Sequence, residues 1–312
     1  MSSSKTSSNT YTIIFMMTLC FICAFFLSIL ATSLEPLQNK AKQLDKSKQL
    51  LIAAKVLNSQ GYFQIQITPS SKDTAYKIPV FTAAKYDAKL QKLVKGLPSD
   101  LASDNEIATI FKDRVHSMLV DEQGNEYSFS ELKINLYDYL DDHEKMGFAN
   151  LRHKLVYKVT TNSSPEKKVP SAIAYVLPVN GMGLWDKIYG YLAISSDGNH
   201  VIGTTWYDQK ETAGLGANIA TPAWQTDFLG KVIFMEDAAG TTNFQTAPLG
   251  INVVRGKVKD VYPSSSKANS AVDGISGATL TGNGVTKAYK NSLTPYRNFF
   301  IKLNKQYKTV KN

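Results

Sequence analysis

A run of small and hydroxyl-bearing residues, from Asp273 to Gly284, is the part of the chain best suited to chemistry. It reads Asp-Gly-Ile-Ser-Gly-Ala-Thr-Leu-Thr-Gly-Asn-Gly, and apolar residues at helical spacing follow it directly. We expect a helix that begins within this run, with Thr281 as its N-cap. Glycines let backbone N–H groups approach a ligand, and the positive end of a helix favours an anion. The run therefore predicts a phosphate site.

Three familiar phosphate and nucleophile patterns fail on this run. Gly277 and Gly282 have the spacing of a Walker A loop, but Asn283 stands where the phosphate-binding lysine is required. Ala278 replaces the second glycine of a Gly-x-Ser-x-Gly nucleophile elbow. The glycine fingerprint of dinucleotide-binding folds is incomplete, both here and at residues 214–216. What remains is a hydroxyl flanked by glycines at the start of a helix.

The order of motifs in the carboxyl-terminal half resembles that of one family. Glu211-Thr-Ala-Gly-Leu-Gly comes first, then a tryptophan-bearing helical segment, then Phe228-Leu-Gly-Lys, and finally Ser276-Gly-Ala-Thr. This succession is similar to the FMN-binding domain of the sodium-translocating NADH:quinone oxidoreductase, where the subunit designated C carries it, over roughly residues 172–300. The related subunit of the Rnf-type electron-transport complex, designated G, shares the last motif. Ala213 stands where many members of the family have proline.

The resemblance implies a covalently bound cofactor. In this family a flavin transferase attaches FMN by a phosphoester bond to the last threonine of the motif, which here is Thr279. The cofactor-binding residues that the resemblance implies are Ser276, Gly277, Ala278, Thr279, Glu211, Thr212, Gly214, Leu215 and Lys231. Leu215 is expected against the flavin ring, and Glu211 and Thr212 at the ring edge or the ribityl hydroxyls. Lys231 is expected to balance nearby negative charge.

The residues themselves suggest no further chemistry. A threonine hydroxyl is a weak nucleophile without an adjacent base, and no base is evident, which favours modification by an outside enzyme. No catalytic residue is expected, and the four histidines share no ligand spacing that would indicate a metal site. The three tryptophans are interpreted as core residues rather than as flavin platforms.

Composition sets broad limits on the function. With 43% hydrophobic and 20% charged residues over 312 positions, the chain is ordinary globular material with room for a sizeable core. The net charge of +9 comes from dispersed lysines, and no nucleic-acid-binding motif accompanies it, so no nucleic-acid partner is expected. Cys20 and Cys23 both lie in an apolar run, where we interpret them as small packing residues.

The amino-terminal segment predicts a membrane anchor. Residues 11–32 contain no charged side chain and are long enough to cross a bilayer, so we expect a transmembrane helix at 11–33 after a cytoplasmic tail at 1–10. A juxtamembrane helix or stalk is expected at 34–60. Four lysines at positions 40–48 outnumber Lys5 and would place the following domain in the cytoplasm. The resemblance implies the periplasmic side of a bacterial inner membrane, and we follow it.

The fold class expected is α+β: an N-terminal transmembrane helix followed by an α+β FMN-binding domain with a helical insertion. Residues 61–168 are expected to form a mainly helical α+β region, 169–300 the FMN-binding domain, and 301–312 a basic C-terminal tail. Capping boxes that begin at Ser103 and Ser128 predict two helices in the first of these regions. Apolar runs predict strands at 172–179, 188–195, 200–207 and 250–258, the middle two forming a hairpin.

The function implied by the resemblance is electron transfer by a membrane-anchored flavoprotein subunit. The implied partners are the membrane, flavin and iron–sulfur subunits of a sodium-pumping NADH:quinone oxidoreductase, the flavin transferase, and the lipid bilayer. Because the chain has no NADH fingerprint and one transmembrane segment, it is not a complete enzyme by itself. Three alternatives stay open: the corresponding subunit of an Rnf-type complex, an anchored protein that binds phosphate noncovalently or has a structural role, and a hydrolase using Ser276.

Overall fold

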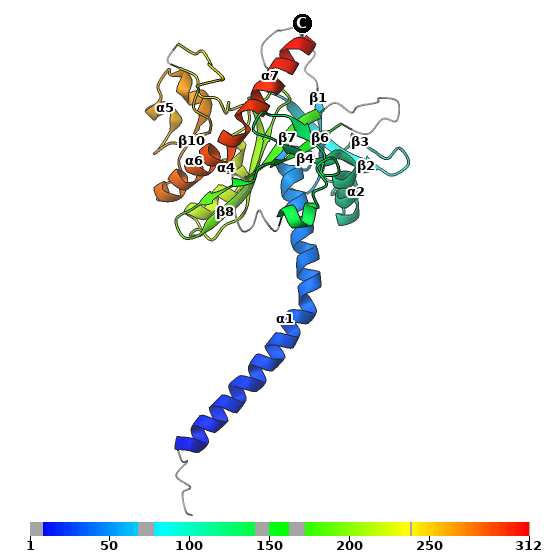
Figure 1. The fold of residues 1–312 in the computed structure, drawn as a ribbon, viewed down its shortest axis with the longest axis vertical. Coiled ribbons are helices and arrows are strands. Elements are labelled where there is room, and N and C mark those ends of the chain that lie inside the picture. The colour runs from blue at the N-terminus through cyan, green and yellow to red at the C-terminus, as the bar shows by residue number, and fades with distance from the viewer. Residues whose placement is uncertain (1–8, 68–77, 141–149, 162–171, 238, 312) are drawn as a thin grey trace, which may run out of the picture. The chain divides into compact units, whose positions relative to one another are not determined.

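The structure is a computed structural model that describes residues 9–67, 78–140, 150–161, 172–237 and 239–311 (Figure 1). By its internal contacts the chain divides into two compact units, residues 1–46 and residues 47–312. The mixed helix-and-sheet architecture confirms the expected α+β class.

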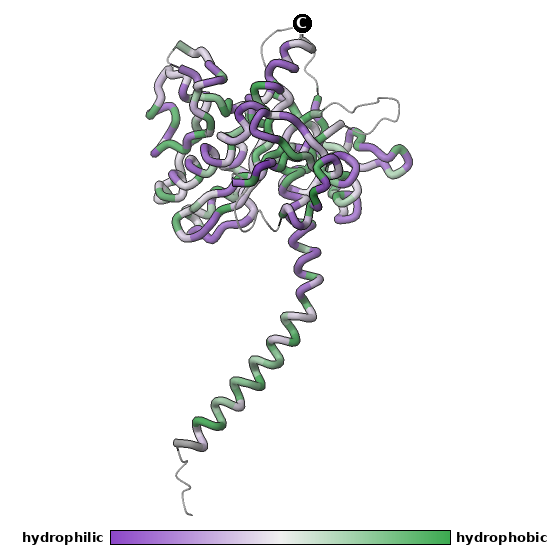
Figure 2. The backbone as a smooth tube through the Cα atoms, in the orientation of Figure 1, coloured by the Kyte–Doolittle hydropathy of each residue, from purple (hydrophilic) through white to green (hydrophobic). Residues whose placement is uncertain are grey.

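Helix α1 runs without interruption from Asn9 to Ala53 and contains Pro36. It is the one helix among the described residues that is long and apolar enough to cross a membrane, and its apolar part is not buried by protein. Figure 2 shows hydrophobic residues along the first part of α1 and hydrophilic residues along the turns that follow. The last two residues of the tail predicted at 1–10 already belong to α1, which begins at Asn9. Residues 1–8 lie outside the described ranges.

The segment predicted as a stalk at 34–60 is helical only to Ala53. Its last turns belong to the second unit, where Leu50, Leu51 and Ala53 are buried. Thr205 donates its hydroxyl to the Gln49 carbonyl at 3.2 Å, which joins these turns to the sheet of the same unit. The segment is therefore part of the folded unit at its carboxyl end.

The prediction that residues 61–168 are mainly helical was wrong. Strands β1 (Phe63–Ile67), β2 (Val80–Asp87) and β3 (Lys92–Lys95) form a three-stranded antiparallel sheet. Strands β4 (Val115–Val120), β5 (Glu126–Tyr127) and β6 (Lys154–Thr160) belong to the large sheet. Over short runs, the apolar residues of this region fit the period of a helix and the period of a strand equally well. Pairing between strands therefore decided which structure formed.

Of the two capping boxes, only the first begins a helix at once. Ser103 caps α2 (Asp104–Arg114), with reciprocal hydrogen bonds between Ser103 and Glu106. Ser128 and Glu131 make the same reciprocal bonds, but they close a turn, and helical residues follow only at 136–140. The box therefore marks a chain reversal as readily as a helix start.

A six-stranded antiparallel sheet forms the centre of the second unit, in the order β5-β4-β6-β7-β8-β9. Strands β7 (Ala172–Met182), β8 (Lys187–Ile194) and β9 (Val201–Asp208) confirm the strands and the hairpin predicted here. Helix α6 (Thr279–Leu293) packs on this sheet through a face that includes Val285, Ala288 and Tyr289. These side chains join Leu177, Leu192, Phe228 and others in the main core.

Two glycines let α6 lie directly on the end of β7. A Cβ atom at Gly284 would stand 2.3 Å from the Met182 carbonyl oxygen. A Cβ atom at Gly181 would stand 2.5 Å from the Cβ of Ala288. Larger side chains at either position would push the helix off the strand, because packed backbones do not move apart without loss of contacts. The first turn of α6 is thereby fixed relative to the sheet.

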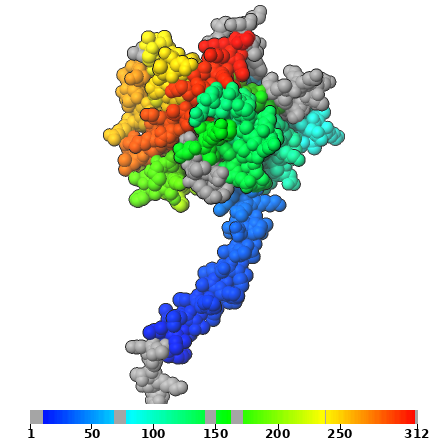
Figure 3. Space-filling view, in the orientation of Figure 1, coloured from blue at the N-terminus to red at the C-terminus, as the bar shows by residue number. Residues whose placement is uncertain are grey.

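The carboxyl end was also predicted incorrectly. Helix α7 (Arg297–Lys311), which follows the short η4 (Thr294–Tyr296), continues through the boundary set at residue 300. Ile301 and Leu303 are buried, so the expected basic tail at 301–312 begins as part of the core. Figure 3 shows α7 in red at the surface. The Asn298 side chain donates to the Glu122 carbonyl, in the turn between β4 and β5, at 2.8 Å.

The strand predicted at 250–258 is reduced to two residues. Strand β10 (Asn252–Val253) pairs in parallel with β11 (Ala271–Val272), and the chain between them contains α5 (Val258–Val261) and η3 (Ser266–Ser270). Upstream, η2 (Gly216–Ala220) and α4 (Pro222–Thr226) follow the Glu-Thr-Ala-Gly-Leu-Gly motif. The connection from β11 to α6 carries the remaining motif residues.

Candidate functional site

Thr279 is the first residue of α6 and its side chain is exposed. A tight turn precedes it: the Ala278 N–H donates to the Ile275 carbonyl at 3.1 Å, and Gly277 has a φ of +73° that a glycine adopts without strain. The N-cap is Ala278, not Thr281 as predicted, and no side chain caps the helix. The first turn carries no acidic residue either, and a helix start of this kind favours an anion.

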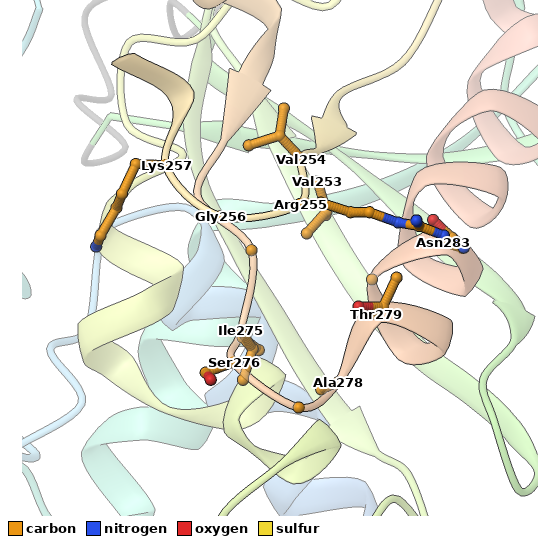
Figure 4. A pocket seen from close by; sticks show the side chains of 13 residues that line it. Val253, Val254, Arg255, Gly256, Lys257, Ile275, Ser276, Ala278, Thr279 and Asn283 are labelled. Atoms are coloured by element: carbon orange, nitrogen blue, oxygen red, sulfur yellow. The ribbon is translucent and has the colours of Figure 1, made fainter. Parts of the chain in front are cut away.

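A cavity of about 430 Å³ opens beside Thr279 (Figure 4). One wall is the end of β10 and the segment after it, which contribute the apolar side chains Val253 and Val254 together with Arg255 and Lys257. The other wall is the turn before α6 and the first turns of that helix, through to Asn283. The volume falls in the range of small-molecule sites, about 300–1,000 Å³. Ser276, Gly277 and Ala278, all predicted as site residues, line this cavity with Thr279.

The two cations of this cavity differ in their surroundings. The Lys257 ammonium lies 2.9 Å from the Asp273 carboxylate, which also accepts the Val258 N–H at 2.7 Å. Desolvation alone raises the pKa of Asp273, but the Val258 N–H and the Lys257 ammonium outweigh it and hold that pKa below its ordinary value. Arg255 is exposed and makes no ion pair with any described residue, and in Figure 4 its side chain extends towards α6.

A second cavity, of about 200 Å³, adjoins Thr279 as well. Its walls are mostly apolar or backbone, and its lining residues are Leu184, Thr212, Leu215, Gly216, Gly277, Ala278, Thr279, Leu280 and Thr281. Leu184, Leu215 and Leu280 are each more than 40% exposed, which is unusual for leucine side chains gathered at one place. Trp185 donates its indole N–H to the Thr212 hydroxyl at 3.0 Å beside them. Thr212 and Leu215, both predicted as site residues, therefore line the same cavity as Thr279.

The remaining predicted residues lie elsewhere. Glu211 is buried, accepts the backbone N–H groups of Leu184 and Trp185, and lines neither cavity. Gly214, with a φ of +75°, shapes the turn that carries Leu215. Lys231 donates to the Ala268 carbonyl at 3.0 Å and lines neither cavity.

Lys231 lies near two carboxylates of the chain itself. Burial lowers its pKa, and the carboxylates of Asp227 and Asp273 act in the opposite direction. Its charge therefore belongs to a cluster that also contains Asp227, Asp273 and Lys257. The link to the Thr279 site is indirect, through Asp273.

Several residues of the site were not predicted from the sequence. Arg255, Asn283 and Leu184 line the cavities, and Trp185 is 65% exposed, in contrast to its interpretation as a core residue. Trp206 and Trp224 are buried as expected. The two glycines at 181 and 183 were the available signal for Trp185, because a glycine-rich turn presents side chains at a surface.

The fold and the site together define a class of protein. An antiparallel sheet supports a helix whose uncapped first turn presents a threonine between two cavities, and residues 183–294 match the family of the FMN-binding domain. Relatives of the full chain come from the Na(+)-translocating NADH-quinone reductase, in each case the subunit designated C. The chain is 39% identical over 309 residues to that of Chlamydia caviae, covering 95% of this chain and 94% of the relative. It is 38% identical over 309 residues to that of Chlamydia muridarum, with coverages of 94% and 93%.

The chain belongs to this family of Na(+)-translocating NADH-quinone reductase subunits, the one designated C. Among solved structures, the crystal structure of the same subunit from Parabacteroides distasonis matches with a TM-score of 0.51 and 23% identity, covering 86% of this chain and 96% of that one. That likeness concerns the fold. The extent of the sequence matches, which include the amino-terminal segment, favours the sodium-translocating reductase over the Rnf-type complex.

Proposed function

We propose that this chain is a membrane-anchored electron-transfer subunit that carries FMN in a phosphoester bond to the Thr279 hydroxyl. It would relay electrons within a sodium-translocating NADH:quinone reductase, the complex for which its relatives are named. The observation that carries the proposal is the place of Thr279. Its exposed side chain stands on an uncapped helix start at the junction of two cavities.

The phosphoryl group fits the larger cavity. The first-turn N–H groups of α6 and the guanidinium of Arg255 are its donors, and none of the residues lining this cavity is acidic. The apolar walls of the smaller cavity suit the isoalloxazine ring, with Leu184 and Leu215 against it and the Thr212 hydroxyl at its border. The flavin supplies the one- and two-electron chemistry, and these residues hold it and limit its contact with water.

Attachment would require a separate flavin transferase. None of the described residues that line the two cavities is Asp, Glu or His, so no base stands ready to take the proton of the Thr279 hydroxyl. The exposure of Thr279 in the folded unit gives an outside enzyme access to it. Covalent attachment then prevents loss of a cofactor that lies in open cavities.

The membrane anchor is the apolar part of α1, and we place the second unit on the periplasmic side of a bacterial inner membrane. The length and composition of α1 support the anchor. Limited proteolysis of intact spheroplasts tests the orientation: cleavage of the domain by external protease is expected. Protection in intact spheroplasts, with cleavage only after lysis, would place the domain in the cytoplasm instead.

The covalent bond is tested by mass analysis of the Thr279 peptide from chain co-expressed with a flavin transferase. We expect the peptide to carry the mass of a flavin mononucleotidyl group, the denatured protein to stay yellow, and Thr279→Val to abolish both. Ser276→Ala is the matched control, because it removes a neighbouring exposed hydroxyl and should still be modified. An unmodified Thr279 peptide and a colourless protein would favour noncovalent phosphate binding or a structural role.

A further inference from the structure

Glu211 is a buried carboxylate, 7% exposed, whose neighbours at both oxygens are hydrogen-bond donors. Oε1 accepts the Leu184 N–H at 3.0 Å and the Trp185 N–H at 3.1 Å. Oε2 accepts the Thr281 hydroxyl, and the Leu184 nitrogen also lies 3.1 Å from it. No described lysine, arginine or histidine pairs with this carboxylate. Its negative charge is therefore balanced by dipoles alone.

The carboxylate lies directly behind the wall of the smaller cavity. Leu184 and Thr281 line that cavity and donate to the Glu211 carboxylate, and Gly216, which also lines it, lies beside the Glu211 side chain. A Cβ atom at Gly216 would stand 2.9 Å from Oε2, and one at Gly183 would stand 2.5 Å from Oε1. Two glycines are thus needed to admit the carboxylate. Glu211 itself does not line the cavity, but residues that bond to its carboxylate do.

Three segments meet at this carboxylate. Leu184 and Trp185 come from the turn between β7 and β8, Gly216 from the motif segment, and Thr281 from the first turn of α6. Each segment contributes to the surroundings of Thr279. A single side chain therefore ties the residues around the smaller cavity to the helix start that carries the attachment site.

We infer that Glu211 is a positioning residue that also lowers the reduction potential of the flavin. The inference rests on the proposed function, in which the ring occupies the smaller cavity. Reduction increases the negative charge of the ring unless each electron is followed by a proton. A fixed carboxylate that has no ion-pair partner among the described residues, and that is bonded to residues lining the cavity, disfavours that added charge in a water-poor surrounding. The reduced flavin is thereby destabilised relative to the oxidised flavin.

Glu211→Gln tests the inference in the full chain flavinylated by co-expression with a transferase. The amide oxygen can still accept hydrogen bonds from the Leu184 and Trp185 N–H groups. The amide nitrogen can donate to the Thr281 hydroxyl, which can act as an acceptor as well as a donor. Shape is retained while the charge is removed. We expect the midpoint potential, measured by reductive titration of the visible flavin absorbance, to move to a more positive value. A flavinylated Gln variant with an unchanged or lower potential overturns the inference.

Thr281→Val is the matched variant, because it removes one donor and leaves the charge. The carboxylate is then less compensated, and the potential is expected to move to a more negative value. If the Gln variant is too unstable to purify, Thr281→Val alone tests the inference. An unchanged or higher midpoint potential in Thr281→Val then overturns it. Failure of the proposed function looks different: the Thr279 peptide of the unsubstituted chain would then be unmodified, and no covalently bound flavin could be titrated.

Discussion

Arg255 and Lys257 line one cavity two residues apart, yet only one of them has an ion-pair partner among the described residues. Lys257 is engaged by Asp273 at 2.9 Å, whereas Arg255 forms no such pair there. The proposed phosphoryl group would add a negative charge to the same cavity. Because the planar guanidinium binds phosphate oxygens in a bidentate manner, Arg255 is the side chain suited to this group.

Arg255→Gln is therefore expected to weaken the stabilisation that flavinylation gives to the chain. An exposed charge pair contributes up to about 1 kcal/mol, so the loss should be of that order and should diminish at high salt. The measurement is the free energy of unfolding of the flavinylated and unmodified forms. Lys257→Gln is the control, and it should change both forms equally. Equal losses in both forms of the Arg255 variant would show that the guanidinium does not contact the phosphoryl group.

Two glycines of the 211–216 motif are predicted to be required for different reasons. Gly214 has a φ of +75° and open space around it, so Gly214→Ala is expected to cost about 1–2 kcal/mol as backbone strain. Gly216→Ala would place a methyl group 2.5 Å from the Thr281 hydroxyl, at a cost of about 1–3 kcal/mol from overpacking.

The two causes can be separated with a second substitution. Thr281→Ala should restore part of the free energy of unfolding lost in Gly216→Ala, since it removes the nearest clashing atom. It should restore nothing in Gly214→Ala. Additive losses in the Gly216 pair would contradict the assigned contact.

At the scale of elements, the turn before α6 is held by a carboxylate that titrates. Asp273 accepts hydrogen bonds from the Val258 N–H and the Lys257 ammonium, and its pKa lies below the ordinary 3.8. An acid whose folded pKa is depressed adds stability above its unfolded pKa, and this stability is lost as pH falls through the folded pKa. The attachment of the segment after β10 to the motif turn should therefore weaken in acid.

We expect Asp273→Asn to lower the free energy of unfolding at pH 7, and the difference from the unsubstituted chain to shrink as the pH falls below 3.8. Urea unfolding of the unmodified chain from about pH 7 to about pH 3 measures this, a window that brackets the onset of carboxylate protonation. Asp186→Asn is the comparison variant, because Asp186 forms an exposed ion pair with Lys210 in a part of the sequence far from Asp273. A difference for Asp273→Asn that stays constant over this range would mean that its carboxylate is not the titrating group.

Strands that coincide with strong apolar runs were predictable, whereas the strands of the region 61–168 were not. Residues 172–208 combine three apolar runs with an Asp-Gly turn, and β7, β8 and β9 follow that pattern closely. The region 61–168 has strands of two to eight residues, whose apolar residues fit a helix equally well. Pairing partners distant in sequence decide such segments. Val115, for example, pairs with Val159.

The site was predictable where a motif carried it and not where the fold supplied it. Thr279, Thr212 and Leu215 line one cavity, because the motifs that contain them adjoin the same helix start. Arg255 lies outside any motif, and only the return of the chain from β10 brings it to the cavity. The burial of Glu211 depends on segments that meet only in the fold, so the sequence did not indicate that its carboxylate is enclosed by backbone and hydroxyl donors.

At the scale of the whole molecule, residues 47–312 contain the core and both cavities. We expect this fragment to be soluble and folded, with a melting temperature close to that of the detergent-solubilised full chain. Removal of residues 301–312 should be far more harmful, because Ile301 and Leu303 are buried. At about 1.5–3 kcal/mol for each buried aliphatic side chain, the loss is about 3–6 kcal/mol. Equal melting temperatures for the two fragments, 47–312 and 47–300, would contradict the core assigned to α7.

Trp185 gives the molecule an intrinsic optical reporter. It is the one tryptophan of three that faces solvent, and it stands beside the smaller cavity, while Trp206 and Trp224 are enclosed. Indole emission from a wet surface lies at longer wavelength than emission from a core, so its contribution is separable. Attachment of the proposed flavin should quench the long-wavelength part of the tryptophan emission spectrum first. Maturation of the chain can then be followed by fluorescence.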